Sequence, residues 1–118
     1  MTEYTADNWV VLKINKPQDP HYRVLAGWSG GYLDGDSWRL NSGITFHESD
    51  CDYWYFYGSS GSRYKCHVNS YRMTGSMCQV YQNLINKYGE DVIQLVEDQE
   101  WKKKDWDWLI KQENKEDK

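Results

Sequence analysis

The sequence predicts an α+β domain: an antiparallel β-sheet meander of four to five strands, one amphipathic helix packed on a face of the sheet, and a Trp-rich C-terminal helix. Two observations carry this prediction. Residues 38–68 alternate between apolar and polar side chains, which is typical of strands with one buried face. After Val68 the apolar residues recur at steps of three and four, which is typical of a helix. Locally paired strands followed by one packed helix indicate the α+β class.

Two strands are expected before the alternating region. Residues 9–14 and 21–28 are rich in β-branched and aromatic residues, and the two prolines between them cannot lie in a central ladder. The two segments are therefore predicted to pair antiparallel. Residues 29–36 contain three glycines and are expected to form a loop, whereas residues 1–7 are polar and expected to fray.

In the alternating region, every second side chain is expected to point to the same face of the sheet. Residues 38–47 are expected to form one strand with a bulge near Gly43, and residues 53–57 and 63–68 to form a hairpin through the small residues of 58–62. One parity is predicted to face the core together with the helix, giving Trp38, Leu40, Ile44, Phe46, Trp54, Phe56, Val80, Leu84 and Ile85. The other parity is predicted to place cations and histidines on one solvent-exposed face, namely Arg39, His47, Arg63, Lys65 and His67.

The helix is predicted over residues 76–88. Ser76 and Gln79 have the spacing of a capping box, and Gly89 stands where a C-terminal cap with positive φ is common. Residues 91–96 are short and apolar and are interpreted as a further strand, with a helical continuation as the alternative.

The domain is expected to cover residues 1–111, and the charged segment 112–118 is expected to be a disordered tail. The hydrophobic share of 39% and mean hydropathy of −0.93 are low, but seven Trp and ten Tyr supply large rings for a core. No apolar run approaches the roughly 18 residues that a membrane span requires, and the first residues lack a signal-peptide pattern. Three widely spaced cysteines fit a reducing compartment. A cytoplasmic protein is therefore expected.

The net charge of −4 comes from residues 90–118, which hold ten acidic residues and six lysines. The remaining residues hold eight of each sign, and their cations lie on a few predicted strands. This distribution argues against a large basic patch and hence against binding of duplex DNA.

Catalytic and metal motifs are not found in the sequence. The three His and three Cys lack the short paired spacing of zinc ligands, so no metal or cofactor is expected. Gly-x-Ser-x-Gly, His-Glu-x-x-His and Walker patterns are also missing. The sequence leans against an enzyme, and a small hydrolase stays open because a triad is defined by geometry rather than by order.

An anion or nucleotide site is the leading interpretation of the small-residue loops. Backbone amides in Gly/Ser turns can hold a phosphate, Arg adds a bidentate contact, and aromatic rings can stack on a base. The expected ligand-binding residues are Trp28, Tyr32, Arg39, His47, Ser59, Ser60, Arg63, Lys65 and His67. The alternative is that the loops are ordinary turns and the cations solvate an open sheet face.

The Trp-rich C-terminal segment suggests a partner surface. Trp101, Trp106 and Trp108 cannot all point in one direction from one helix, and Trp is over-represented at interface hot spots. One interpretation is that the helix lies in a groove and buries most of itself. The alternative is that Trp101, Trp106 and Trp108 form a surface that binds a host protein or a second copy of the chain.

Three strings carry a resemblance to a known family: Tyr22-Arg23-Val24-Leu25-Ala26-Gly27-Trp28-Ser29-Gly30-Gly31-Tyr32, then residues 36–44 (Asp-Ser-Trp-Arg-Leu-Asn-Ser-Gly-Ile), then residues 57–67 (Tyr-Gly-Ser-Ser-Gly-Ser-Arg-Tyr-Lys-Cys-His). Over roughly residues 9–101 the chain resembles small accessory proteins of large tailed bacteriophages. The resemblance implies expression in an infected bacterial cytosol and a role in host takeover or counter-defence. It assigns no functional residue.

The function expected from the sequence is a non-catalytic phage accessory protein that binds an anionic small ligand such as a nucleotide signal. The first alternative is an inhibitor that binds a host protein through the Trp-rich C-terminal helix. The second alternative is the small hydrolase.

Overall fold

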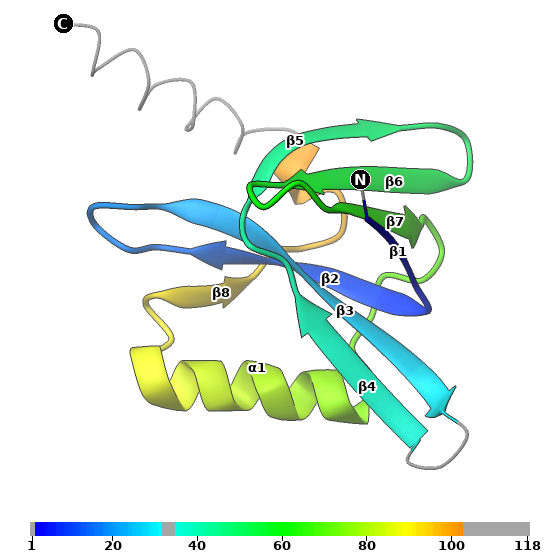
Figure 1. Cartoon of the computed structure of the whole chain (residues 1–118). Helices are drawn as coiled ribbons and strands as arrows, with labels where there is room; N and C mark the ends of the chain where they lie inside the picture. The colour runs from blue at the N-terminus through cyan, green and yellow to red at the C-terminus, as the bar shows by residue number, and fades with distance from the viewer. Residues whose placement is uncertain (1, 32–34, 103–118) are drawn as a thin grey trace, which may run out of the picture.

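The computed structural model describes residues 2–31 and 35–102, and within them the chain forms three layers (Figure 1). A four-stranded sheet lies at the top of the view, a second four-stranded sheet crosses the middle, and the helix α1 lies at the bottom. The α+β class is confirmed, but the single sheet expected from the sequence is two sheets. The predicted C-terminal helix and tail fall mostly in residues 103–118, which lie outside the described residues, as does Tyr32.

The first sheet contains, in spatial order, β1 (Glu3–Ala6), β7 (Arg63–His67), β6 (Tyr53–Gly58) and β5 (Ile44–Ser49). The predicted hairpin of β6 and β7 is confirmed. The N-terminal segment does not fray, because β1 pairs in parallel with β7. Two side-chain contacts hold it there: Arg63 Nη2 lies 2.9 Å from Glu3 Oε2, and the Tyr4 and Tyr64 rings are 5.1 Å apart.

The second sheet contains, in spatial order, β4 (Gly35–Leu40), β3 (His21–Gly31), β2 (Asn8–Ile14) and β8 (Ile93–Leu95). All neighbours are antiparallel, so the predicted pairing of β2 with β3 and the predicted short strand β8 are confirmed. Residues 29–31 continue β3 instead of starting a loop. The central strand β2 is buried along nearly its whole length, because both faces of this sheet are covered.

Two cores lie on opposite faces of the second sheet. The core between the sheets is aromatic and includes Trp9, Trp54, Phe56, Tyr64 and Trp101. The core between the second sheet and α1 is aliphatic and includes Val10, Leu12, Leu25, Met77 and Ile93, with Val80, Leu84 and Ile85 packed against it. The prediction that the helix packs on a sheet is confirmed, and the sheet it covers is the second one.

The helix α1 spans Gly75–Tyr88, close to the predicted range. Its N-cap is Thr74, so Ser76 belongs to the first turn instead of capping it. At the other end Gly89 has φ 96°, and its N–H donates to Ile85 O at 2.7 Å. A side chain at Gly89 would strain this positive-φ conformation, which explains the glycine that ends the helix.

Residues 38–47 are not one strand, contrary to expectation. The strand β4 ends at Leu40 in the second sheet and β5 begins at Ile44 in the first, so residues 41–43 cross between the sheets. Asn41 fixes the start of the crossing: its side-chain Oδ1 accepts from the Val24 N–H at 2.8 Å, and its own N–H donates to Val24 O at 3.0 Å. Gly43 supplies the turn with φ 135°.

A β-bulge at the start of β5 then reverses the predicted faces. Ile44 pairs with Gly58 and Phe46 pairs with Tyr57, so Thr45 is the extra residue. Because one inserted residue exchanges the faces of a strand, Phe46 points outward and is 56% exposed, whereas His47 turns inward. The prediction was therefore wrong for both residues.

The other predicted core residues divide by their place in the sheets. Ile44, Trp54 and Phe56 are buried as predicted. Leu40 is partly buried against the aliphatic core. Trp38 lies on the edge strand β4 and is 50% exposed, so its predicted burial was wrong.

A short 3-10 helix, η1 (Glu100–Lys102), ends the described chain. Its Trp101 is 0% exposed and lies between the two sheets, with ring centroids 5.4 Å from Trp9, 5.3 Å from Trp54 and 5.2 Å from Tyr71. The one helix of the described chain with several turns, α1, is too short and too polar to cross a membrane.

Candidate functional site

The outer face of the first sheet carries a row of tyrosines. Along β6, Trp54 and Phe56 point into the core, so the three alternate tyrosines point outward. Cross-strand pairing places a basic residue of β7 beside each of them: Tyr53 with His67, Tyr55 with Lys65, and Tyr57 with Arg63. We call these six residues the tyrosine face.

The basic side chains lie close to the aromatic rings. Lys65 Nζ is 4.4 Å from the centroid of the Tyr53 ring, and Arg63 Cζ is 5.1 Å from that of Tyr55 and 5.8 Å from that of Tyr57. His67 meets the Tyr53 ring edge-on at 5.1 Å. Each such cation–π contact at an exposed site contributes about 0.5–1 kcal/mol, so the free protein already orders these side chains.

Carboxylates at the rim orient the phenol groups. The Tyr57 hydroxyl donates to Glu48 Oε2 at 2.5 Å, and the Tyr55 hydroxyl donates to Asp50 Oδ2 at 3.0 Å. Desolvation and this hydrogen bond to a carboxylate raise the pKa of Tyr55. The rings of Tyr55 and Tyr57 are therefore held in place by both their faces and their hydroxyl groups.

Asp50 and Arg63 are both held in their charged forms. Hydrogen bonds from the backbone N–H groups of Asp52 and Tyr53, at 2.9 and 2.8 Å, lower the pKa of Asp50. The Tyr57 hydroxyl and the Glu3 carboxylate raise the pKa of Arg63. The face thus carries fixed charges of both signs around its aromatic centre.

The structure brings together three of the predicted ligand-binding residues, Arg63, Lys65 and His67. Arg39 lies elsewhere, on β4 of the second sheet, with its Cζ 4.3 Å from the centroid of the Tyr4 ring. Tyr4 pairs with the buried Tyr64, so Arg39 lies on the opposite side of the first sheet from Arg63. The expectation of one face shared by Arg39 and Arg63 was wrong.

Two further predicted residues also lie away from the tyrosine face. The indole N–H of Trp28 donates to Thr5 O at 2.6 Å and so ties the second sheet to β1. His47 packs inward, with ring centroids 5.6 Å from Trp54 and 6.2 Å from Phe56. Burial lowers the pKa of His47.

Four amide N–H groups in the loop of residues 58–62 already donate to acceptors within the protein. The Gly58 N–H donates to Ser62 O, the Ser59 N–H to Gly43 O, the Ser60 N–H to Ser42 Oγ, and the Gly61 N–H to Gly58 O, at 2.8 to 3.0 Å. These four donors are already used within the protein, so they are not available to the phosphate cradle expected at this loop. The hydroxyl groups of Ser59 and Ser60 each form a hydrogen bond with the Ser42 hydroxyl, at 3.1 Å.

The predicted partner-binding residues are only partly described. Trp101 is a core residue and presents no surface to a partner. Trp106 and Trp108 lie outside the described residues.

Sequence reasoning missed Tyr53 and Tyr55 as site residues. The signal was present, because tyrosines at every second position alternate with Trp54 and Phe56. In a strand this alternation separates apolar rings from amphipathic rings, and only tyrosine carries a hydroxyl group suited to the solvent side.

The fold and this surface define a three-layer α+β protein with an aromatic and charged sheet face. No protein-family model, curated protein or solved structure matches the chain.

Proposed function

We propose that this protein is a non-catalytic binding protein that holds a nucleotide on the tyrosine face. The observation that supports the proposal is the row of three outward tyrosine rings with a lysine and an arginine directly beside them. Planar bases stack on such rings, and stacking contributes about 1–3 kcal/mol per base. In the phage setting that the sequence resemblance implies, the ligand would be a nucleotide signal.

Lys65 is the cation best placed to bind the phosphate. Arg63 is already paired with Glu3 at 2.9 Å, whereas Lys65 has no ion pair within 4.0 Å among the residues that the structure describes. Moving Lys65 from the Tyr53 ring to a phosphate would exchange a cation–π contact of about 0.5–1 kcal/mol for a charge-assisted hydrogen bond of about 1.5–3 kcal/mol. The vacated ring of Tyr53 would then stack on the base.

Acidic residues border both ends of the tyrosine face, so the free cation decides where the phosphate lies. Glu3 and Glu48 border the end of the face that holds Arg63 and Tyr57, and Asp50 borders the end that holds Tyr53 and Lys65. The proposed orientation places the phosphate near Lys65 and His67, because Lys65 has no ion pair within 4.0 Å among the described residues. The rings of Tyr53 and Tyr55, whose centroids are 6.2 Å apart, then hold the base.

The inhibitor alternative loses one of its three residues, because Trp101 is used by the core. It would depend on Trp106 and Trp108 alone. The nucleotide proposal is favoured because its residues are gathered on one described surface.

The proposal is tested by isothermal titration calorimetry with a panel of mononucleotides and dinucleotides at low and high salt. We expect at least one ligand to bind, with an affinity that falls as salt increases. Tyr53→Ala should weaken that ligand by about 5- to 150-fold, the range for one lost stacking contact. Lys65→Gln should weaken it by about 2- to 70-fold, the net of the two exchanged contacts, and reduce its salt dependence.

Lys87→Gln is the matched control. Lys87 also lies over a tyrosine, with its Nζ 5.2 Å from the centroid of the Tyr88 ring, but on the helix. This variant should bind like the wild type. Absence of heat and of any shift in melting temperature across the whole panel would refute the proposal, as would equal weakening by Lys65→Gln and Lys87→Gln.

A further inference from the structure

Among the described strands, β4 has a neighbour on one side only, because it forms the outer edge of the second sheet (Figure 1). The other outer strands are covered, short or irregular. In β1 the Thr5 carbonyl accepts from the Trp28 indole at 2.6 Å, β8 has three residues, and β5 contains the bulge at Thr45. Residues 37–40 pair regularly with β3 and include neither proline nor lysine, two residues that protect sheet edges.

The backbone groups on the outer side of β4 belong to Trp38 and Leu40. The Asn41 N–H donates to Val24 O at 3.0 Å, so residue 41 faces β3. Hydrogen-bonded and non-hydrogen-bonded pairs alternate in an antiparallel ladder, so the odd-numbered residues of β4 also face β3. The N–H and C=O groups of Trp38 and Leu40 therefore point to the edge, where a further strand could bind them.

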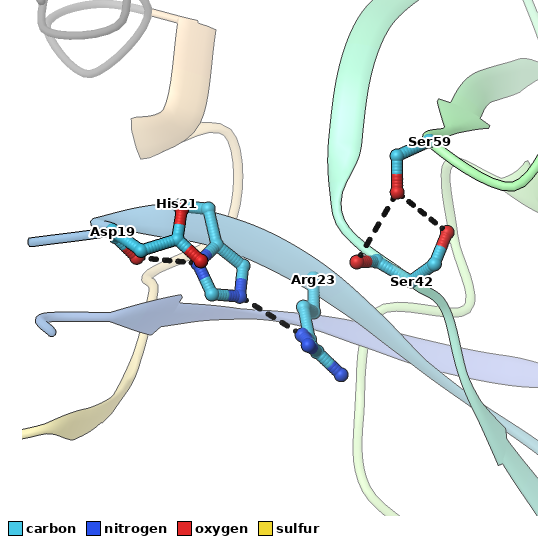
Figure 2. A network of polar contacts seen from close by, with 5 residues as sticks. All are labelled: Asp19, His21, Arg23, Ser42 and Ser59. Atoms are coloured by element: carbon cyan, nitrogen blue, oxygen red, sulfur yellow. Dashed lines mark hydrogen bonds and ion pairs between the residues drawn. The ribbon is translucent and has the colours of Figure 1, made fainter.

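The crossing between the sheets sets the end of this edge. Figure 2 shows Ser42 held by the β6–β7 loop: the Ser59 hydroxyl lies 3.1 Å from the Ser42 hydroxyl and 3.4 Å from the Ser42 carbonyl oxygen. Gly43, with φ 135°, then leads the chain into the first sheet. The edge open to a further strand is therefore residues 36–40.

Trp38 is an exposed aromatic residue on this edge. Gly27 pairs with Trp38, and a Cβ at Gly27 would lie 2.4 Å from Met77 Sδ, so this face of the strand is the α1 face. Trp38 is nevertheless 50% exposed. Two half-exposed rings that cover each other would remove about 150–250 Å² from water, and Trp is over-represented at interface hot spots.

Arg39 and Ser37 lie on the opposite face of β4, and both are exposed. The Arg39 guanidinium stacks over the Tyr4 ring, with its Cζ 4.3 Å from the ring centroid. Arg39 has no ion pair within 4.0 Å among the residues that the structure describes. A strand that binds this edge would therefore meet an aromatic ring on one face and an unpaired cation on the other.

We infer that two copies of the chain associate by pairing their β4 strands antiparallel, about a two-fold axis at Trp38. In this arrangement Trp38 lies opposite Trp38 of the second copy, and Ser37 lies opposite Arg39 of the second copy. The second sheets of the two copies become one continuous sheet. The inference is independent of the proposed function, because β4 contains none of the residues of the tyrosine face.

The strand is complementary to itself in this register. Paired aromatic rings stabilise neighbouring strands, and the Ser37 hydroxyl oxygen can accept from the guanidinium opposite it. Moving one strand by two residues would place Arg39 opposite Arg39 of the second copy, or would separate the two Trp38 rings, and like charges directly opposite each other are destabilising. A second copy is favoured over a foreign strand because β4 itself supplies both matching groups.

The test is sedimentation equilibrium of the whole chain over a series of concentrations, with backbone amide exchange followed by NMR at both ends of the series. One strand pair is a small interface, so we expect a dimer that dissociates on dilution. In the monomer the amides of Ser37 and Arg39 should be protected, whereas those of Trp38 and Leu40 should exchange rapidly. In the dimer all four should be protected.

Trp38→Ala should weaken the dimer by about tenfold or more, because it removes the aromatic pair at the centre of the interface. Phe46→Ala is the matched control. Phe46 is also an exposed aromatic residue on an outer strand, 56% exposed on β5, and this variant should associate like the wild type.

Two variants of Ser37 test the register. Ser37→Asp places a carboxylate opposite Arg39 of the second copy and should tighten the dimer by several-fold, whereas Ser37→Lys opposes two cations and should weaken it by several-fold. General repulsion between copies of a chain with net charge −4 predicts the reverse order, since Ser37→Asp makes the chain more acidic.

The inference is overturned if the chain is a monomer at every concentration, or if it forms a dimer in which the amides of Trp38 and Leu40 still exchange rapidly. Equal weakening by Trp38→Ala and Phe46→Ala, or the reverse order for the two Ser37 variants, would also overturn it. Lys65→Gln, which tests the proposed function, should associate like the wild type.

Discussion

Replacing Trp101 tests whether this residue holds the two sheets together. In Trp101→Ala the lost side chain is fully buried and meets four other rings, at centroid distances of 5.2 to 5.9 Å. A buried aromatic side chain removes about 150–250 Å² from water, which at about 25 cal/mol per Å² is roughly 4–6 kcal/mol. Measured Trp→Ala losses of about 3–5 kcal/mol agree with this figure. We expect a loss in that range.

Trp101→Phe separates packing from hydrogen bonding. The indole N–H of Trp101 is buried and has no acceptor among the described residues. Burying an unbonded donor costs about 1–3 kcal/mol, and phenylalanine removes that donor while keeping most of the ring volume. We therefore expect Trp101→Phe to cost less than about 2 kcal/mol, well below the alanine variant.

The assay is urea unfolding followed by circular dichroism, with the slope of the free energy against denaturant compared among the variants. An unchanged slope shows that the denatured state is comparable, so that the shift in midpoint reports stability. A loss below about 1 kcal/mol for Trp101→Ala would refute the placement of this residue in the core. Equal losses for the alanine and phenylalanine variants would refute the argument from the unbonded N–H.

Three further predictions concern the packing and pH dependence of the fold. A Cβ at Gly27 would lie 2.4 Å from Met77 Sδ, so Gly27→Ala should lower the free energy of unfolding by about 1–3 kcal/mol. In urea unfolding, the double variant with Met77→Ala should deviate from the sum of the two single effects by at least about 0.5 kcal/mol. Gly43 has φ 135°, so Gly43→Ala should lower the free energy of unfolding by more than about 1 kcal/mol in the same assay. Burial lowers the pKa of His47 below its ordinary value of 6.5, so the unfolded chain binds the proton more tightly and stability should fall as the pH drops below 6.5. His47→Gln should therefore lose less melting temperature than the wild type between pH 7.5 and 5. An identical pH profile for the two proteins would contradict the prediction.

The parts of the fold that follow from local pattern were predictable. The helix α1 and the β6–β7 hairpin depend on residues close in sequence, and both were located to within a few residues. The division of residues 38–47 between two sheets was not predictable from alternation alone. Alternation reports the local period of a strand, and a single bulge residue, Thr45, exchanged the faces of everything after it in β5.

The candidate site was predicted only in part, because a sequence pattern places side chains within one strand but not between distant segments. Arg63, Lys65 and His67 lie on one short regular strand, so their shared face follows from the period of two. Arg39 is separated from them by the crossing between the sheets. The amides of Ser59 and Ser60 bond to Gly43 and Ser42, which are distant in sequence, so the loop sequence alone did not reveal that they are used.

The pairing of β1 with β7 has a consequence for the order in which the protein folds. The first sheet joins residues from both halves of the chain, and the Trp9 indole N–H donates to His67 O across a separation of 58 residues. The aromatic core is complete only when Trp101 is in place. Domains dominated by such distant contacts close large loops before they gain stabilising contacts, and they fold in roughly milliseconds to seconds. During synthesis, one face of the apolar strand β2 therefore stays uncovered until the last described turn, η1, has been made. Until then this face can associate with other chains.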